Sequence, residues 1–122
     1  MLKKLVKNKY TIRCFNIASA IFPRLQENMY LSAMSSHMGN PDGTPNDAVN
    51  AYLVAKVKGG WGLVFTEDLG VTKDAGSDPV VGSLWSDDQV PAWSETVRQV
   101  HAAGGLMGAQ IYHAGIFNID ND

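Results

Sequence analysis

Hydroxyl, carboxylate and amide side chains end each of three apolar runs in this sequence, and together they could bind a polar ligand. They lie in residues 32–36, 66–68 and 110–113. An amide such as that of Gln110 offers two hydrogen-bond donors and an acceptor, and it makes poor core material unless a polar partner meets it. The pattern therefore suggests ligand binding through hydrogen bonds, with Gln110 as its clearest candidate.

The titratable residues do not form an evident catalytic set, so catalytic residues stay unassigned. Glu67 and Asp68 are adjacent, and neighbours in a strand point to opposite faces, which argues against shared acid/base chemistry. Glu67 is expected to accept structural hydrogen bonds. Strand parity directs His113 toward the helix layer, which favours a structural role over a catalytic one. The histidines share no metal-ligand spacing, so no metal is predicted.

Two strand-and-helix units and a third strand would position these groups. We expect strands over residues 30–34, 61–66 and 106–112. Residues 61–66 are nearly unbroken in apolar character, which is typical of a strand covered on both faces. The order βαβαβ predicts a parallel sheet, and parallel α/β folds bind ligands at the carboxyl ends of their strands.

The first connecting helix is predicted from its caps and its spacing. Asn46 or Thr44 would cap its start, and Gly59 would supply a left-handed stop. Its buried face is expected to consist of apolar residues at helical spacing, namely Val49, Tyr52, Leu53 and Val57.

The second helix follows a long loop over residues 70–85, and loops of that length are usually functional or mobile. Residues 86–89 form a capping box in which Ser86 and Gln89 satisfy free backbone donors. Gly104 ends this helix. Its buried stripe is expected to consist of Val90, Trp93, Val97 and Val100.

Alternation assigns the two faces of the third strand. One face, suited to packing beneath the helices, carries Met107, Ala109 and Ile111. The opposite face carries Gly108, Gln110 and Tyr112. Gln110 is therefore expected on the face away from the helices.

Composition is that of one ordinary soluble globular domain, with 45% hydrophobic and 18% charged residues. The formal net charge is −2, and the basic cluster within residues 3–9 gives little reason to expect nucleic-acid binding. Cys14 is the single cysteine, so an internal disulfide and a cysteine-built metal or redox site are excluded. A reducing cytoplasm fits this composition.

Residues 1–29 are basic at first and then mostly apolar, which faintly imitates a secretory leader. The apolar stretch is short, contains Asn16 and Ser19, and meets Pro23 without a clear cleavage site. We interpret residues 1–29 as a separate lead-in segment, poorly ordered or capping the sheet, in preference to a signal peptide. No run approaches the ~20 apolar residues of a membrane span, so no membrane partner is expected.

Five segments, in the right order, resemble the amino-terminal part of the old yellow enzyme family of FMN-dependent NAD(P)H:flavin oxidoreductases and ene-reductases. In one-letter code they are 31–35 (LSAMS), 43–45 (GTP), 62–67 (GLVFTE), 85–90 (WSDDQV) and 110–115 (QIYHAG). The family folds as a (β/α)8 TIM barrel. The resemblance therefore implies an α/β fold in which residues 30–122 supply the first three strands and two helices of an incomplete barrel, whereas residues 1–29 match poorly.

The resemblance also implies a set of FMN-binding residues. The family's first-strand motif, usually Ala-Pro-Met followed by Thr or Cys, falls on Ser32, Ala33, Met34 and Ser35. Ser35 would hydrogen-bond near the flavin O4 and N5 atoms, with Ala33 and Met34 lining the ring. The adjacent Ser36 is an equally plausible hydroxyl.

Two further positions complete this set. The family's glutamine that reads the pyrimidine edge of the flavin falls on Gln110, whose alternative role is that of a satisfied core amide. The family's small residue after the Thr-Glu of the second strand falls on Asp68. A carboxylate there would repel a flavin that becomes anionic on reduction, and would lower its reduction potential. Ala33 in place of proline is a milder departure.

The function implied by this resemblance is that of an oxidoreductase in which FMN accepts hydride from NADH or NADPH and passes it to an electron-poor alkene or a similar small molecule. In the family, several functional groups lie farther along than Asp122. They are the His/His or His/Asn pair that holds the substrate, the catalytic tyrosine, the basic residue at the flavin and the phosphate-binding loops. A (β/α)8 barrel needs about 250 residues. We therefore expect a truncated gene product, one half of a split enzyme or a designed segment, without turnover alone.

Two other readings stay open. Three parallel strands alone would leave an open sheet edge. In the second reading, the chain is a non-catalytic subunit or decayed fragment that pairs with a companion chain through this edge. In a third and weaker reading, it belongs to another (β/α)8 enzyme that uses the same strand ends.

Overall fold

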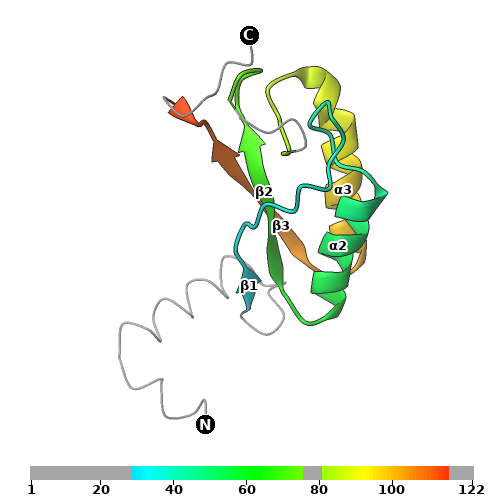
Figure 1. The fold of residues 1–122 in the computed structure, drawn as a ribbon. Helices are drawn as coiled ribbons and strands as arrows, with labels where there is room; N and C mark the ends of the chain where they lie inside the picture. Colours follow the sequence, from blue (N-terminus) through cyan, green and yellow to red (C-terminus); the bar gives the residue numbers. More distant parts are fainter. Residues whose placement is uncertain (1–28, 76–80, 116–122) are drawn as a thin grey trace, which may run out of the picture.

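The structure is a computed structural model that describes residues 29–75 and 81–115. In chain order the elements are β1 (Tyr30–Leu31), α2 (Asp47–Lys58), β2 (Leu63–Gly70), the 3-10 turn η2 (Asp87–Gln89), α3 (Val90–Ala102) and β3 (Leu106–Tyr112). The strands form one parallel sheet in the order β1-β2-β3. Both helices lie on one side of this sheet, which confirms the predicted βαβαβ order (Figure 1).

The strand bounds differ from the prediction in β1 and β2, whereas β3 begins and ends where predicted. β1 reaches only Leu31 instead of residue 34, because its pairing with β2 stops there. β2 begins at Leu63 and continues to Gly70, because its pairing with β3 resumes at Asp68 after an irregularity. The polar residues 66–68 therefore lie inside β2 and not beyond its end.

The caps of α2 confirm one prediction and correct another. Asn46 is the N-cap, and its Oδ1 accepts hydrogen bonds from the backbone N–H groups of Ala48 and Val49 at 3.0 and 3.2 Å. Gly59 is not the left-handed stop, since its φ is −79°. The left-handed residue is Gly60, with φ +105°, so the helix turns one residue later than predicted.

The predicted capping box at the start of the second helix is confirmed. Ser86 accepts from the backbone of Asp88, and Gln89 Oε1 accepts from the backbone N–H of Ser86 at 3.3 Å. The box opens η2, which runs directly into α3. Gly104, with φ +96°, follows the end of α3 as predicted. No described helix combines the length and apolar character that crossing a membrane requires.

The buried stripe of α3 differs from the predicted one. Val90 is 46% exposed, because it is the first residue of the helix and lies outside the contact with the sheet. Thr96 takes a place on the buried side between Trp93 and Val100, and is fully buried. Its hydroxyl donates to Oδ1 of Asn50 on α2 at 2.7 Å. A polar pair therefore joins the two helices inside the core.

The hydrophobic core lies between the helices and the sheet. Its buried cluster consists of Val49, Leu53, Val57, Val64 and Val100. Tyr52 packs against this cluster from a half-buried position, so the predicted face of α2 is confirmed.

The predicted packing of β3 beneath the helices holds only at its start. Met107 packs against the core cluster, whereas Ala109 is exposed and Ile111 is 74% exposed. The reason is that α3 leads straight into the beginning of β3, and no described element covers the outer half of this face.

The described parts of the predicted loop over 70–85 are held by hydrogen bonds. Gly70 forms an isolated parallel bridge with Ser83, and the indole N–H of Trp93 donates to the Ser83 carbonyl at 2.8 Å. Residues 76–80 lie outside the described part of the chain. The predicted lead-in segment also lies outside it, except for Met29.

Candidate functional site

A β-bulge in β2 sets the direction of the carboxylates. Phe65 pairs with Gly108 and Asp68 pairs with Gln110, so two residues of β2 stand opposite one residue of β3. A bulge shifts the side-chain alternation by one residue. Asp68 therefore shares the face of Phe65 and Gln110, which is the face turned away from α2 and α3.

Ser35, Asp68 and Gln110 come together on this face. The Gln110 Nε2 donates to Asp68 Oδ1, and the Ser35 hydroxyl donates to Asp68 Oδ2 at 3.4 Å. Ser35 and Gln110 are exposed and Asp68 is half-buried. Residues that are 33 and 42 positions from Asp68 in sequence thus share one carboxylate at the rim of the sheet.

Glu67 points to the opposite face of β2 and accepts hydrogen bonds from Ser36, the residue after Ser35. Glu67 is 6% exposed, and its Oε2 accepts from the backbone N–H of Ser36 at 2.6 Å and from the Ser36 hydroxyl at 2.9 Å. The prediction that Glu67 accepts structural hydrogen bonds is confirmed. Because Ser36 is bound to Glu67, Ser35 is the hydroxyl that the structure brings to Asp68.

Thr66, the other residue of the bulge, fixes the backbone of Gln110. Its hydroxyl oxygen accepts the Gln110 backbone N–H at 3.1 Å, and its side chain is buried, with 2% exposed. The side chain thus replaces a backbone acceptor that the bulge displaces. Sequence reasoning placed Thr66 among the polar side chains that could bind a ligand and missed this structural role, for which the only signal was three consecutive polar residues between apolar ones.

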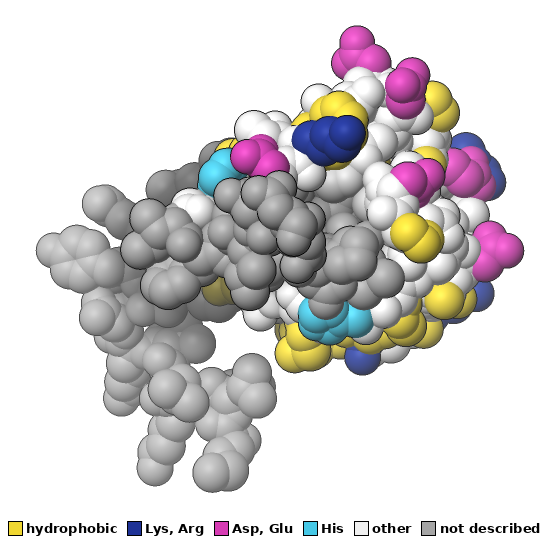
Figure 2. Space-filling model, turned by 45° about the horizontal axis from the view of Figure 1, so that its top comes forward, with side chains coloured by type: hydrophobic (Ala, Val, Ile, Leu, Met, Phe, Trp, Pro, Cys, Tyr) yellow, Lys and Arg dark blue, Asp and Glu magenta, His cyan; other side chains and the backbone are white. Residues whose placement is uncertain are grey.

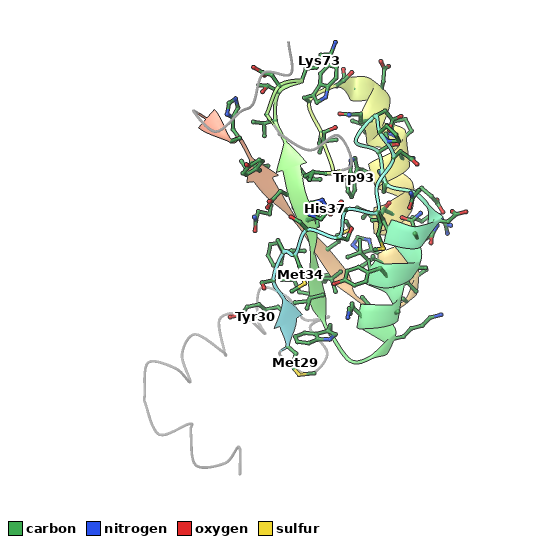
Figure 3. The ribbon with its side chains drawn as sticks, viewed as in Figure 1. Met29, Tyr30, Met34, His37, Lys73 and Trp93 are labelled. Carbon is green, nitrogen blue, oxygen red and sulfur yellow. The ribbon has the colours of Figure 1, made fainter. Side chains whose placement is uncertain are left out.

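The other predicted flavin-contacting residues follow β1. Ser32 is exposed, Ala33 is half-buried, and Met34 is 65% exposed. Figure 3 shows Met34 on the segment that leads away from β1, on the sheet side of α2. Ser32 and Met34 also border a small cavity of about 10 Å³ beneath this segment, which is about the size of one water molecule. A flavin would have to lie on the open face instead.

His113 has a local role after β3. Its side chain is exposed, not buried beneath the helices, and its Nδ1 accepts the backbone N–H of Gly115 at 2.9 Å. The pKa of Asp74 is lowered mainly by a hydrogen bond from the Thr72 hydroxyl and, to a smaller extent, by the charge of His113. Within residues 29–75 and 81–115, no three His, Cys, Asp or Glu side chains could hold a metal ion.

Surface charge shows no concentration of one sign in the view of Figure 2. On the part of that face that is not grey, acidic side chains are interspersed with single basic ones. The ion pair found among the described residues joins Arg98 to Glu95 on α3, at 2.6 Å. Ser35, Asp68 and Gln110, by contrast, form a polar surface whose side chains are joined by hydrogen bonds.

Comparisons of sequence give the relatives of this chain. Residues 20–121 match the model of the NADH:flavin oxidoreductase / NADH oxidase family. The NADPH dehydrogenase of Listeria welshimeri is 34% identical over 92 residues, which cover 75% of this chain and 27% of the relative. The probable inactive reductase easA of Epichloe festucae var. lolii is 30% identical over 91 residues, covering 75% and 24%. The chain thus spans about a quarter of the length of these relatives.

Solved structures with a similar fold point to the same group of proteins. The old yellow enzyme homologue from Zymomonas mobilis superposes with a TM-score of 0.62 at 28% identity, over 70% of this chain and 23% of that one. The Old Yellow Enzyme from Pichia sp. AKU4542 gives a TM-score of 0.65 at 21% identity, which shows the shared fold alone. The predicted fold class, part of a (β/α)8 barrel, is confirmed. The chain belongs to the NADH:flavin oxidoreductase / NADH oxidase family.

Proposed function

We propose that this chain is the amino-terminal portion of an FMN-dependent oxidoreductase, in which Ser35 and Gln110 contact the isoalloxazine ring. The observation that carries the proposal is the meeting of these two side chains on one exposed rim, in a chain that belongs to a flavin oxidoreductase family. When bound, FMN would supply the redox chemistry by accepting hydride from a nicotinamide and passing it on.

The hydrogen-bonding groups on the rim suit the polar edge of a flavin. Asp68 takes one N–H of the Gln110 amide, and no described residue bonds the second N–H or Oε1. The amide thus keeps a donor beside an acceptor for a planar ring that offers the same pair. The Ser35 hydroxyl can donate or accept next to it. Ser32, Ala33 and Met34 would add surface along the ring.

We further propose the reductant, the acceptor and the location. NADPH or NADH is the reductant, in line with the name of the Listeria relative, NADPH dehydrogenase. The acceptor is an electron-poor small molecule, which follows from the family alone. The reducing cytoplasm is the location, because Cys14 has no second cysteine with which to form a disulfide within the chain. No turnover is expected of residues 1–122 alone.

A hybrid barrel tests the proposal. In this hybrid, residues 30–115 replace the matching segment of the old yellow enzyme homologue from Zymomonas mobilis, which has the same fold over this region. We expect the purified hybrid to be yellow, to retain FMN through gel filtration, and to bleach anaerobically with NADPH. A hybrid that folds, as judged by circular dichroism, but stays colourless in excess FMN contradicts the proposal.

A second candidate function is that of a non-catalytic subunit that pairs with a companion chain. The observation that favours it is the edge position of β3, with Ile111 74% exposed on the outer half of the strand, which no described element covers. An unpaired strand edge is a template for another strand. Size-exclusion chromatography with and without FMN separates the two: a flavin-free oligomer supports pairing, and a compact flavin-loaded monomer contradicts it.

A further inference from the structure

Asp68 binds the same two side chains that the proposed function assigns to the flavin. Its Oδ1 accepts from the Gln110 amide and its Oδ2 accepts from the Ser35 hydroxyl. Resting on the proposed function, we propose that Asp68 is an internal competitor of the flavin. It occupies the Ser35 hydroxyl and one of the two Gln110 N–H groups, so the ring can use these two donors only by displacing the carboxylate, and Asp68 thereby sets the flavin affinity of this chain.

The backbone keeps Asp68 within reach of both partners. The bulge at Thr66 and Glu67 turns the carboxylate onto the face of Gln110, and the Thr66 hydroxyl holds the Gln110 backbone N–H at 3.1 Å. On the other side, Glu67 fixes the backbone of Ser36, directly after Ser35, at 2.6 Å. The partners of Asp68 are therefore anchored, so opening the rim requires rotation of side chains and not movement of strands.

The chemistry of a carboxylate makes Asp68 a competitor and not a ligand. An ionised carboxylate has acceptors only, whereas the Ser35 position would face flavin O4 and N5, which also accept hydrogen bonds. Asp68 thus offers no donor to the ring and withdraws two donors from it. Hydrogen bonds to a charged acceptor are stronger than those to a neutral one, so a neutral flavin oxygen replaces Asp68 at the Gln110 amide at a disadvantage. The Ser35 bond is long, at 3.4 Å, and contributes less to this competition.

If Asp68 competes with the flavin, variants at this position should differ in FMN affinity in a definite order. Asp68→Ala frees both partners, whereas Asp68→Asn keeps one oxygen for Gln110 and loses the charge. We expect FMN affinity to rise by about tenfold to a hundredfold in Asp68→Ala, which corresponds to the loss of a charge-assisted competing bond. Asp68→Asn should lie between Ala and the wild type. Asp88→Ala removes an equal charge on the exposed η2 turn and should leave affinity unchanged.

Titration of the ¹⁵N-labelled 122-residue chain with FMN, followed by NMR, tests the proposal. In the free chain, the Gln110 side-chain NH₂ signals should shift in Asp68→Ala and stay in place in Asp88→Ala. Tighter FMN binding by Asp68→Ala and, to a lesser degree, by Asp68→Asn supports the proposal. Equal or weaker binding by both Asp68 variants overturns it, and so does a titration in which no variant binds FMN.

The hybrid barrel keeps this result separate from the proposed function. The proposed function stands if the hybrid holds FMN with Asp68 in place, whatever the titration of the shorter chain shows. The competitor model additionally requires the hybrid's dissociation constant for FMN to fall in Asp68→Ala. Unchanged affinity in a yellow hybrid overturns the competitor model alone.

Discussion

Replacement of Glu67 should detach the segment after β1 from β2. The Glu67 carboxylate is nearly buried and accepts two hydrogen bonds from Ser36, at 2.6 and 2.9 Å. Glu67→Ala leaves the backbone N–H and the hydroxyl of Ser36 without this acceptor. Glu67→Gln keeps one side-chain oxygen but removes the charge. Because Ser35 precedes Ser36, the same change should also release Ser35 from Asp68.

The magnitude follows from the kind of bond that is lost. A hydrogen bond to a charged group contributes about 1.5–3 kcal/mol, and exposure of the freed donors to water reduces the cost. We therefore expect Glu67→Ala to lower the free energy of unfolding by about 2–4 kcal/mol and Glu67→Gln by about 1 kcal/mol. Ser36→Ala removes the hydroxyl bond to Glu67 and the longer bond, at 3.4 Å, that the hydroxyl accepts from the Met38 backbone N–H, and it should cost about 1–2 kcal/mol.

Urea unfolding followed by tryptophan fluorescence measures these values, since Trp93 is buried at 6% exposure. A double-mutant cycle with Glu67→Ala and Ser36→Ala isolates the hydroxyl bond, because the backbone bond is lost only in the Glu67 variant. The reasoning is refuted if Glu67→Ala unfolds within about 0.5 kcal/mol of the wild type, the range of ordinary surface substitutions.

Three further predictions concern packing, pH and redox potential. Gly105→Ala would place a Cβ 2.5 Å from a methyl group of the buried Val57, so the free energy of unfolding should fall by about 1–3 kcal/mol in urea; a neutral result would contradict the close approach. Hydrogen bonds from Arg98 and Gln99 lower the pKa of Glu95 to about 2, so the stability that these bonds contribute is fully present above pH 4.5, the usual pKa of the group, and is lost as the pH falls toward 2. In Arg98→Gln, NMR titration should show a Glu95 pKa higher than that of the wild type, and an unchanged pKa would refute the ion pair. In the hybrid barrel, Asp68→Asn should raise the reduction potential of the flavin by about 10–30 mV, because it removes a screened negative charge beside the reduced ring. Anaerobic titration with a redox dye measures this potential, and an unchanged value would place Asp68 away from the ring.

Local signals predicted much of the fold from the sequence. The capping box over residues 86–89 and the cap at Asn46 were predicted correctly because a cap depends on residues within one helical turn. The bounds of β3 were predicted correctly because a glycine pair precedes an apolar run. The family resemblance joined these elements into part of a barrel, and the family match over residues 20–121 confirms it.

Features that depend on contacts between distant segments could not be predicted. The bulge at Thr66 and Glu67 arises from pairing with β3, so alternation within β2 alone gives the wrong face for Asp68. The burial of Thr96 depends on its hydrogen bond to Asn50 of the other helix. An analysis of hydrophobic periodicity assigns only apolar residues to the buried face, so it could not predict this position. The family resemblance assigned Ser35, Asp68 and Gln110 to one site, but it did not predict the hydrogen bonds that join Asp68 to the other two, because these depend on how three separate segments meet.

The most direct test of the central claim is the FMN dissociation constant of the hybrid barrel and of its Gln110→Leu variant. Gln99→Leu makes the same chemical change on α3, away from the open face of the sheet, and serves as the control. If the Gln110 amide reads the flavin edge, Gln110→Leu should weaken FMN binding by about tenfold or more, as expected for lost hydrogen bonds and an unpaired ring edge. Gln99→Leu should leave it unchanged. Equal dissociation constants for the hybrid and Gln110→Leu, with both proteins folded, would contradict the account.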